Sequence, residues 1–216
     1  MKKLIIILLL FPIFITPQAP WTQLGQDIYG SIGGTPPTSA NYVSRLGGLV
    51  SISSSGDRFV VRENYTITTD FIRVYYFTNG SWSQLGSTLN GNYAPYSLHG
   101  LDISGNGSTV VIGSCYFNSS QGKAQVFSFN SGGWNPVGQD LFGDSVYNQF
   151  GGDVSLNYNG NILAVNSRSK NFIQIFSLVG NNWVQMGTNI LGENSGDYFG
   201  DAISLDSTGN RIAIGA

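Results

Sequence analysis

The chain has 216 residues, of which 41% are hydrophobic and 10% charged, whereas about 25% are charged in a typical soluble domain. Its formal net charge is −2 without a long run of one sign, so it lacks the basic footprint of a nucleic-acid or anionic-membrane binder, and we expect no nucleic-acid partner. The single cysteine, Cys115, excludes an internal disulfide and is interpreted as a small buried hydrophobe.

The N-terminus has the pattern of an export signal. Lys2 and Lys3 precede an apolar run from Leu4 to Ile15, which is shorter than the roughly 20 residues of a membrane-spanning helix. Together with the small Ala19 it predicts a signal peptide over residues 1–19, hence a secreted or cell-surface protein with no stable membrane span once the signal is removed. An uncleaved N-terminal anchor is the alternative.

Four tryptophan segments recur along the chain. They are WTQLG at 21–25, WSQLG at 82–86, WNPVG at 134–138 and WVQMG at 183–187, and each is followed by an aliphatic residue two positions before a glycine. Behind them come four segments that end in a Ser-, Asn- or Asp-rich turn and a glycine, at 46–56, 97–107, 150–160 and 199–209. Such self-similarity indicates repeats, which we place near 46–91, 97–143, 150–192 and, in part, 199–216.

Each complete repeat predicts four strands. Alternating apolar runs such as IRVYYF (72–77), AQVFSF (124–129) and IQIFSL (173–178) lie between turns, and no window outside the leader has sustained helical periodicity. Four strands in about 50 residues predict an all-β β-propeller of antiparallel blades over residues 20–216. We expect an incomplete propeller with three full blades and partial first and last blades, in which the strand at Trp21 closes the ring. A small closed ring of four with one strand missing is the alternative.

The third and fourth copies, FGGDVSLNYNG (150–160) and FGDAISLDSTG followed by IAIGA (199–216), resemble FG-GAP repeats. These form the propeller blades of integrin α-subunits and of many secreted microbial proteins. The first and second copies depart from the pattern, with Leu46 and Gly47, and Ser97 and Leu98, in place of Phe-Gly. The resemblance implies a non-enzymatic module that binds or scaffolds other proteins in adhesion-type interactions.

The resemblance also implies calcium loops of D-x-D-x-D-G type, but this chain does not supply them. Only Asp206, of all four turns, places a carboxylate before the glycine, so Asp206 is a weak metal candidate and we expect no calcium and no other cofactor. The acidic group Glu193, Asp197 and Asp201 could hold a cation or a basic partner, or could be a solvated loop. His99, the only histidine, has no second ligand in range and is interpreted as a surface residue.

No catalytic residues are expected. One histidine, no G-x-S-x-G elbow and no phosphate-binding loop predict that the chain is not an enzyme. An enzyme built on a propeller would instead need paired acids that face a central pocket.

Binding is expected at rim loops, because a rigid scaffold usually presents its ligand site on loops. The candidates are Thr35, Pro36 and Pro37 in the insertion Ser31–Tyr42, and Glu193, Asn194 and Asp197 in the loop before the fourth repeat. The four tryptophans, Trp21, Trp82, Trp134 and Trp183, are interpreted as packing residues between blades.

Two alternatives to a protein-binding module remain open. A carbohydrate-binding, lectin-like propeller would gather exposed aromatic residues such as Tyr93, Tyr96 or Tyr147 on one rim. The chain could also be the non-catalytic part of a larger secreted enzyme. The sequence predicts a protein or glycan ligand and does not identify which one.

Overall fold

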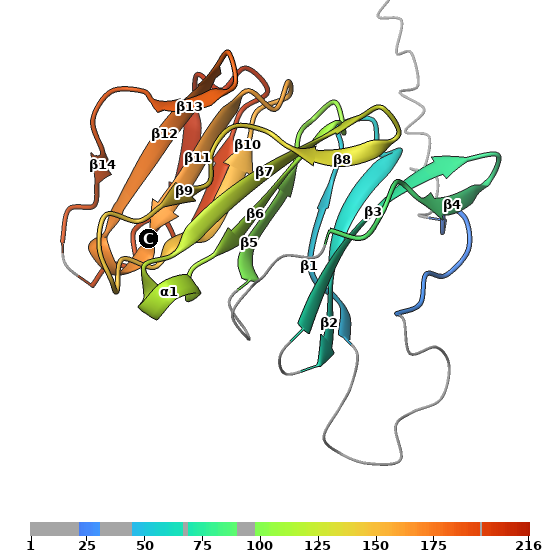
Figure 1. The fold of residues 1–216 in the computed structure, drawn as a ribbon, viewed down its shortest axis with the longest axis horizontal. Helices are drawn as coiled ribbons and strands as arrows, with labels where there is room; N and C mark the ends of the chain where they lie inside the picture. The colour runs from blue at the N-terminus through green and yellow to red at the C-terminus, as the bar shows by residue number, and fades with distance from the viewer. Residues whose placement is uncertain (1–21, 31–44, 67–68, 90–97, 195) are drawn as a thin grey trace, which may run out of the picture.

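The computed structural model describes residues 22–30, 45–66, 69–89, 98–194 and 196–216 (Figure 1). The predicted signal peptide, Trp21 and the insertion Ser31–Tyr42 lie outside these residues, as do Tyr93 and Tyr96. In the described part of the chain, no helix is long and apolar enough to cross a membrane.

One four-stranded, two five-stranded and one two-stranded antiparallel sheet follow one another along the described chain. The first unit, blade 1, contains β1 (Arg45–Ile52), β2 (Arg58–Thr66), β3 (Thr69–Thr78) and β4 (Ser81–Gln84). Blade 2 contains β5 (Leu98–Ile103), β6 (Thr109–Ser114), β7 (Lys123–Asn130), β8 (Gly133–Pro136) and β9 (Leu141–Phe142). Blade 3 contains β10 (Phe150–Leu156), β11 (Ile162–Ser167), β12 (Phe172–Val179), β13 (Asn182–Gln185) and β14 (Ile190–Leu191), and blade 4 contains β15 (Ala202–Leu205) and β16 (Ile212–Gly215).

The outermost strand of a blade is split into two pieces. In blade 3, β13 pairs with the end of β12 and β14 pairs with its beginning, and β8 and β9 do the same on β7. The aliphatic residue that follows the second, third and fourth tryptophan segments forms the second piece, as Leu89 shows by its bridge to Ile72. The sequence pattern included this aliphatic residue but did not indicate that the outermost strand is split in two.

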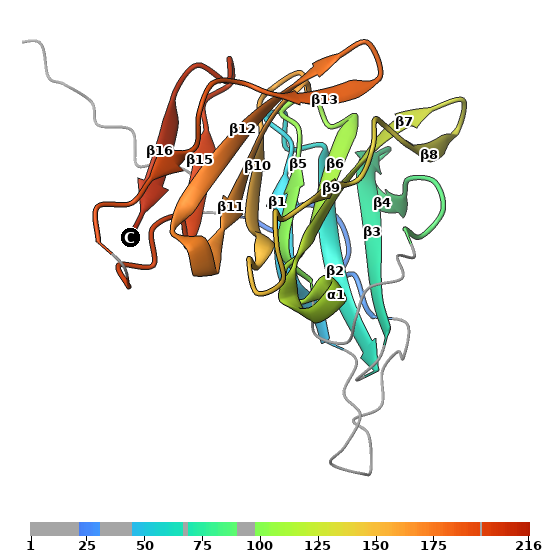
Figure 2. The ribbon, with the colours of Figure 1, turned by 60° about the vertical axis from the view of Figure 1, so that its left-hand side comes forward.

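The first strands of the four blades lie side by side, and the later strands fan outward from them (Figures 1 and 2). Apolar cores fill the spaces between blades, because each sheet has two faces to cover. The core between blades 2 and 3 includes the fully buried Phe150, Leu163 and Val165. Blades 1 and 2 enclose Val60 and Ile72, and blades 3 and 4 enclose Ile173 and Ile203.

Two short helical turns were not predicted. They are α1 (Phe117–Ser120) and the 3₁₀ turn η1 (Arg168–Lys170), both of which join the second strand of a blade to its third. α1 has four residues and none of them is buried, so it has no apolar periodicity that a sequence pattern could detect, and its Asn118 and Ser119 have left-handed backbone angles (φ 48° and 56°). Cys115, directly before α1, is 1% exposed, and its burial raises the pKa of the thiol to about 11.

Candidate functional site: a polar groove on the inner strands

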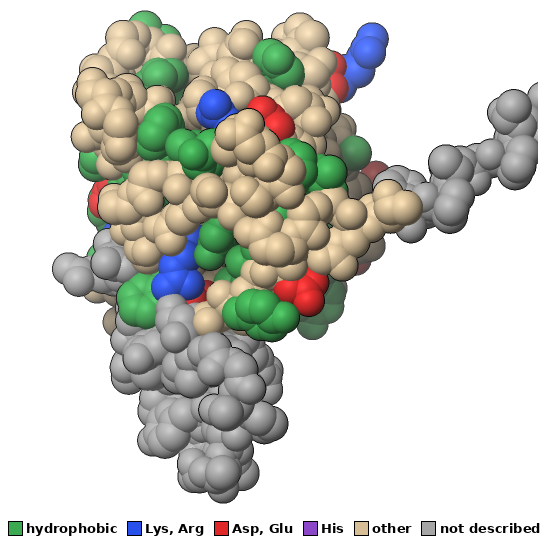
Figure 3. Space-filling model, turned by 90° about the vertical axis from the view of Figure 1, so that its right-hand side faces the viewer, with side chains coloured by type: hydrophobic (Ala, Val, Ile, Leu, Met, Phe, Trp, Pro, Cys, Tyr) green, Lys and Arg blue, Asp and Glu red, His purple; other side chains and the backbone are tan. Residues whose placement is uncertain are grey.

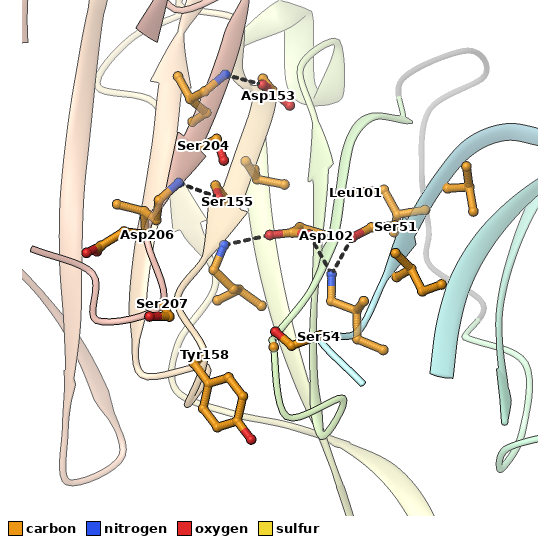
Figure 4. A pocket seen from close by; sticks show the side chains of 18 residues that line it. Ser51, Ser54, Leu101, Asp102, Asp153, Ser155, Tyr158, Ser204, Asp206 and Ser207 are labelled. Carbon is orange, nitrogen blue, oxygen red and sulfur yellow. Dashed lines mark hydrogen bonds between the residues drawn. The ribbon is translucent and has the colours of Figure 1, made fainter. Parts of the chain in front are cut away.

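A groove of about 390 Å³ follows the first strands of all four blades. Its walls combine backbone and aliphatic side chains with hydroxyl and carboxylate groups, which Figure 4 shows from close by. The polar side chains that line it are Ser51, Ser54, Asp102, Asp153, Ser155, Tyr158, Ser204, Asp206 and Ser207. Three are carboxylates and none is Lys, Arg or His, so among the described lining residues the groove is acidic.

One position of the inner strands of blades 1, 2 and 3 carries a polar side chain that bonds the next blade. Ser155 Oγ accepts a hydrogen bond from the Leu205 amide at 3.0 Å, and Asp102 Oδ2 accepts one from the Leu156 amide at 2.7 Å. Ser51 Oγ lies 3.4 Å from the Ile103 amide in the same arrangement. These bonds satisfy strand amides that face the groove, which is a requirement for buried backbone groups.

Asp102 stands where the other three copies have serine. Besides the Leu156 amide, its carboxylate accepts bonds from Ser51 Oγ at 2.6 Å and from the Ile103 amide at 2.9 Å. Burial raises the pKa of Asp102, although these hydrogen bonds to Ser51, Leu156 and Ile103 act in the opposite direction. The aligned repeats contain a signal for this site, because Asp102 is an acid at a position where the other three copies have serine.

Asp153 lies two residues before Ser155 on β10. Its Oδ2 accepts the Ile203 amide at 2.7 Å. Burial, the largest effect, raises the pKa of Asp153 to about 6, and the charges of Asp102 and Asp201 add to the rise. A carboxyl group with this pKa exchanges its proton near pH 6, and Asp153 and Asp102 both line the groove.

The described tryptophans bond the preceding segment of chain through their indole groups. Trp134 Nε1 donates to the Leu85 carbonyl at 2.8 Å, and Trp183 Nε1 donates to the Val137 carbonyl at 3.0 Å. Trp82 makes the same bond to Leu24, at 2.8 Å. These contacts lie away from the groove, and Trp21 falls outside the described residues.

Replacement of Trp183 by Phe tests the contribution of this bond. The aromatic ring would remain, but the Val137 carbonyl would lose its donor, so we expect the free energy of unfolding to fall by about 1–2 kcal/mol. Trp82→Phe, at a less buried ring, should cost roughly half as much. Urea unfolding of the two variants measures the difference, and equal losses would contradict the expectation.

Asp206 does not gather further ligands. Its carboxylate accepts bonds from Thr208 Oγ1 at 2.9 and 3.0 Å and from the Asn210 amide at 2.9 Å, all within its own turn. Among the residues that the structure describes, no three His, Cys, Asp or Glu side chains are placed to hold a metal ion.

The predicted rim residues are not part of the groove. Glu193 and Asn194 are exposed, and the Asn194 amide donates to Asp197 Oδ2 at 3.1 Å within the loop. Asp201 instead pairs with Arg168 at 2.7 Å, so the acidic group does not converge. Thr35, Pro36 and Pro37 lie outside the described residues. His99 is half-buried and packs edge-on against Tyr116, with ring centroids 5.2 Å apart.

Comparison with known proteins identifies the fold. No protein-family model and no curated protein match the chain. Among solved structures, a functionally unknown protein from Desulfotomaculum acetoxidans DSM 771 is 14% identical with a TM-score of 0.54, over 82% of this chain and 50% of that chain. A protein from Lactobacillus plantarum is 16% identical with a TM-score of 0.54, over 79% of this chain and 48% of that one. Kuenenia stuttgartiensis hydrazine synthase is 12% identical with a TM-score of 0.51, over 82% and 59%.

These likenesses confirm the predicted all-β, propeller-like fold. The chain spans about half the length of the first solved structures that it matches. The prediction that the chain is not an enzyme is wrong, because it rested on the absence of familiar catalytic motifs, and hydrazine synthase is among the structures that share this propeller-like fold. At this level of identity the likeness establishes the fold alone and leaves catalysis open.

Proposed function

We propose that this chain is an exported propeller module that binds a protein ligand and receives a basic side chain of that ligand in the groove of its inner strands. The observation that carries the proposal is the acidic lining of the groove, with Asp102, Asp153 and Asp206 and no basic side chain among the described lining residues. A Lys or Arg side chain carries its cation at the end of a long stem, which suits a groove that presents carboxylate and hydroxyl groups.

Asp153 is the most suitable partner for such a cation. The Asp102 carboxylate accepts hydrogen bonds from the Ser51 hydroxyl and from the Ile103 and Leu156 amides. The Asp153 carboxylate accepts backbone amides, those of Ile203 and Val154, and no side-chain hydroxyl is recorded on it among the described residues. Burial deprives the ionised Asp153 carboxylate of part of its hydration. A ligand ammonium beside it would replace that lost hydration with a charge-assisted hydrogen bond. The FG-GAP-like repeats and the predicted signal peptide support an extracellular, adhesion-type role for this binding.

Short peptides test the proposal. We expect an acetylated and amidated Gly-Lys-Gly peptide to bind the full chain, measured by NMR titration, and the corresponding Gly-Gln-Gly peptide to bind far more weakly. Because binding needs the ionised form of a carboxyl group whose pKa is about 6, affinity should fall about tenfold from pH 7.5 to pH 5. Asp153→Asn should remove both the affinity and its pH dependence. Equal binding of the two peptides would refute the proposal.

An exposed tyrosine favours a second candidate, a lectin-like module. Tyr147 is 68% exposed in the connection between blades 2 and 3, and its amide donates to the Ser119 carbonyl of α1 at 3.2 Å. A rigid aromatic ring that faces solvent is a common surface for sugar binding. A glycan array distinguishes the candidates, since glycan binding that is lost in Tyr147→Ala and retained in Asp153→Asn would support the lectin.

A further inference from the structure

Two buried polar atoms at the junction of blades 2 and 3 make no hydrogen bond among the described residues. They are Ser167 Oγ, at the end of β11, and Asn148 Oδ1, in the connection that leads into β10. Ser167 is 0% exposed and Asn148 is 1% exposed. By contrast, the Lys, Arg, Asp and Glu side chains that Figure 3 shows on the side of blade 1 reach the solvent. A buried polar atom without a partner is costly, so both atoms require an explanation.

The Ser167 side chain faces blade 2. Its cross-strand neighbour is Phe150, and Val165 precedes it by two residues on the same strand, so all three lie on one face of the sheet. Phe150 and Val165 belong to the core that blades 2 and 3 enclose. The Ser167 hydroxyl therefore lies at the end of this core, shielded from bulk solvent.

Asn148 lies between the same two blades. Its carbonyl accepts the Ser169 amide at 3.3 Å, which places Asn148 beside η1, next to Ser167 in the chain. On its other side is Gly143, where an added Cβ atom would lie 2.8 Å from both Cβ and Cγ of Asn148. Gly143 directly follows β9, so Asn148 is held between the backbone of blade 2 and the η1 turn of blade 3.

The two atoms need different hydrogen bonds. Asn148 Oδ1 can only accept, whereas the Ser167 hydroxyl can donate and accept. A water molecule offers a donor to the first and an acceptor to the second, and buried waters commonly satisfy such groups. Two neutral oxygens without a carboxylate offer little to a cation. We propose that an ordered internal water molecule binds Ser167 Oγ and Asn148 Oδ1 and joins blade 3 to the connection from blade 2.

This water would help to fix the place at which the chain enters β10. Asn148 lies two residues before Phe150, the first residue of β10, and the same strand carries Asp153 and Ser155 of the groove. The inference rests on packing between blades 2 and 3 and does not depend on which ligand the groove binds.

NMR and crystallography of the full chain test the site directly. We expect a nuclear Overhauser effect with the sign of a long-lived bound water between water and the amide proton of Ser167 or Ser169, and we expect Ser167→Ala to weaken it. A high-resolution crystal structure should place one water within hydrogen-bond distance of Ser167 Oγ and Asn148 Oδ1. A site with no bound water, or with a metal ion in its place, would overturn the proposal.

Urea unfolding tests whether the two residues share one water. We expect Ser167→Ala to raise the equilibrium constant of unfolding about fivefold, because the water loses a partner. Asn148→Ala should raise it too. In the double variant the increase should be about threefold smaller than the product of the two single effects, because the second substitution removes a bond that the first has already weakened. Circular dichroism shows whether each variant is folded.

Ser114→Ala is the matched control. Ser114 ends β6 as Ser167 ends β11, is 0% exposed, and its Oγ also makes no hydrogen bond among the described residues. Gly113 before it meets Gly151 of blade 3, so the Ser114 side chain points to the opposite face of its sheet. The effects of Ser114→Ala and Asn148→Ala should therefore multiply without coupling. If Ser167→Ala is as stable as the parent chain, or multiplies with Asn148→Ala in the same way, the shared water is refuted.

Discussion

Gly113→Ala is expected to lower the free energy of unfolding by about 3 kcal/mol or more, because it forces blades 2 and 3 apart. A Cβ atom on Gly113 would lie 2.2 Å from the Gly151 carbonyl oxygen and 3.0 Å from its carbonyl carbon. Gly151 cannot move away freely, since it has φ +80° and a Cβ atom there would lie 2.5 Å from the Lys123 carbonyl oxygen. The clash is therefore between backbones, which no rotamer change can relieve.

The corresponding contact between blades 3 and 4 shows why this position matters. There Asn166 takes the place of Gly113, and its Nδ2 donates to the Gly200 carbonyl at 2.7 Å. One junction thus uses a side-chain hydrogen bond, and the other uses direct approach of two glycines. Phe150, beside Gly151, is 0% exposed in the core that this approach closes.

Gly133→Ala provides the control for Gly113→Ala. A Cβ atom on Gly133 would meet nothing within 4 Å, so the free energy of unfolding should change by no more than about 0.5 kcal/mol. Denaturant unfolding of both variants measures the two values. If Gly113→Ala unfolds at the same denaturant concentration as the parent chain, the close approach of the blades is absent.

The strands were predictable because each one is short, alternates with period two and ends at a turn. Runs such as IQIFSL (173–178) fall within β12 (Phe172–Val179), since one face of each sheet must pack against a neighbouring blade. The FG-GAP resemblance remains a prediction, because the comparisons show a propeller-like fold and no family. The position of α1 was not predictable, because the turn has four residues, none of them is buried, and Asn118 and Ser119 have left-handed backbone angles that apolar spacing does not indicate.

The groove was harder to predict than the fold. Loop composition predicted ligand binding on the rim, whereas the structure brings polar side chains of four inner strands to one surface. Ser51 and Asp102 are 51 residues apart in the chain, and their contact depends on how two blades sit together. Alternation does place Ser51, Asp102, Ser155 and Ser204 on the same side of their strands, and the single acid among them is the signal that the sequence offers.

Asp153→Asn is expected to stabilise the chain above pH 6, although it removes a charged group with a hydrogen bond. The pKa of Asp153 is about 6 in the folded chain and about 3.9 for an unperturbed aspartate, so the folded state binds its proton more tightly than the unfolded state. Between these two values the folded chain carries more protons, and its free energy of unfolding therefore falls as the pH rises. A shift of this size corresponds to about 2–3 kcal/mol.

Asparagine removes that dependence because it cannot ionise, while its side-chain oxygen can still accept the Ile203 amide that Asp153 Oδ2 accepts at 2.7 Å. We expect the variant to match the parent near pH 4 and to exceed it by about 2 kcal/mol at pH 8, measured by urea unfolding across this range. Asp144→Asn, at an exposed side chain, should shift stability by no more than about 0.5 kcal/mol. A parent chain whose stability rises between pH 4 and 6 while Asp153→Asn shows the same slope would contradict the assignment. If Asp153→Asn is more stable than the parent chain and no longer binds the Gly-Lys-Gly peptide, then the Asp153 carboxylate lowers the stability of the fold and is needed to bind the peptide.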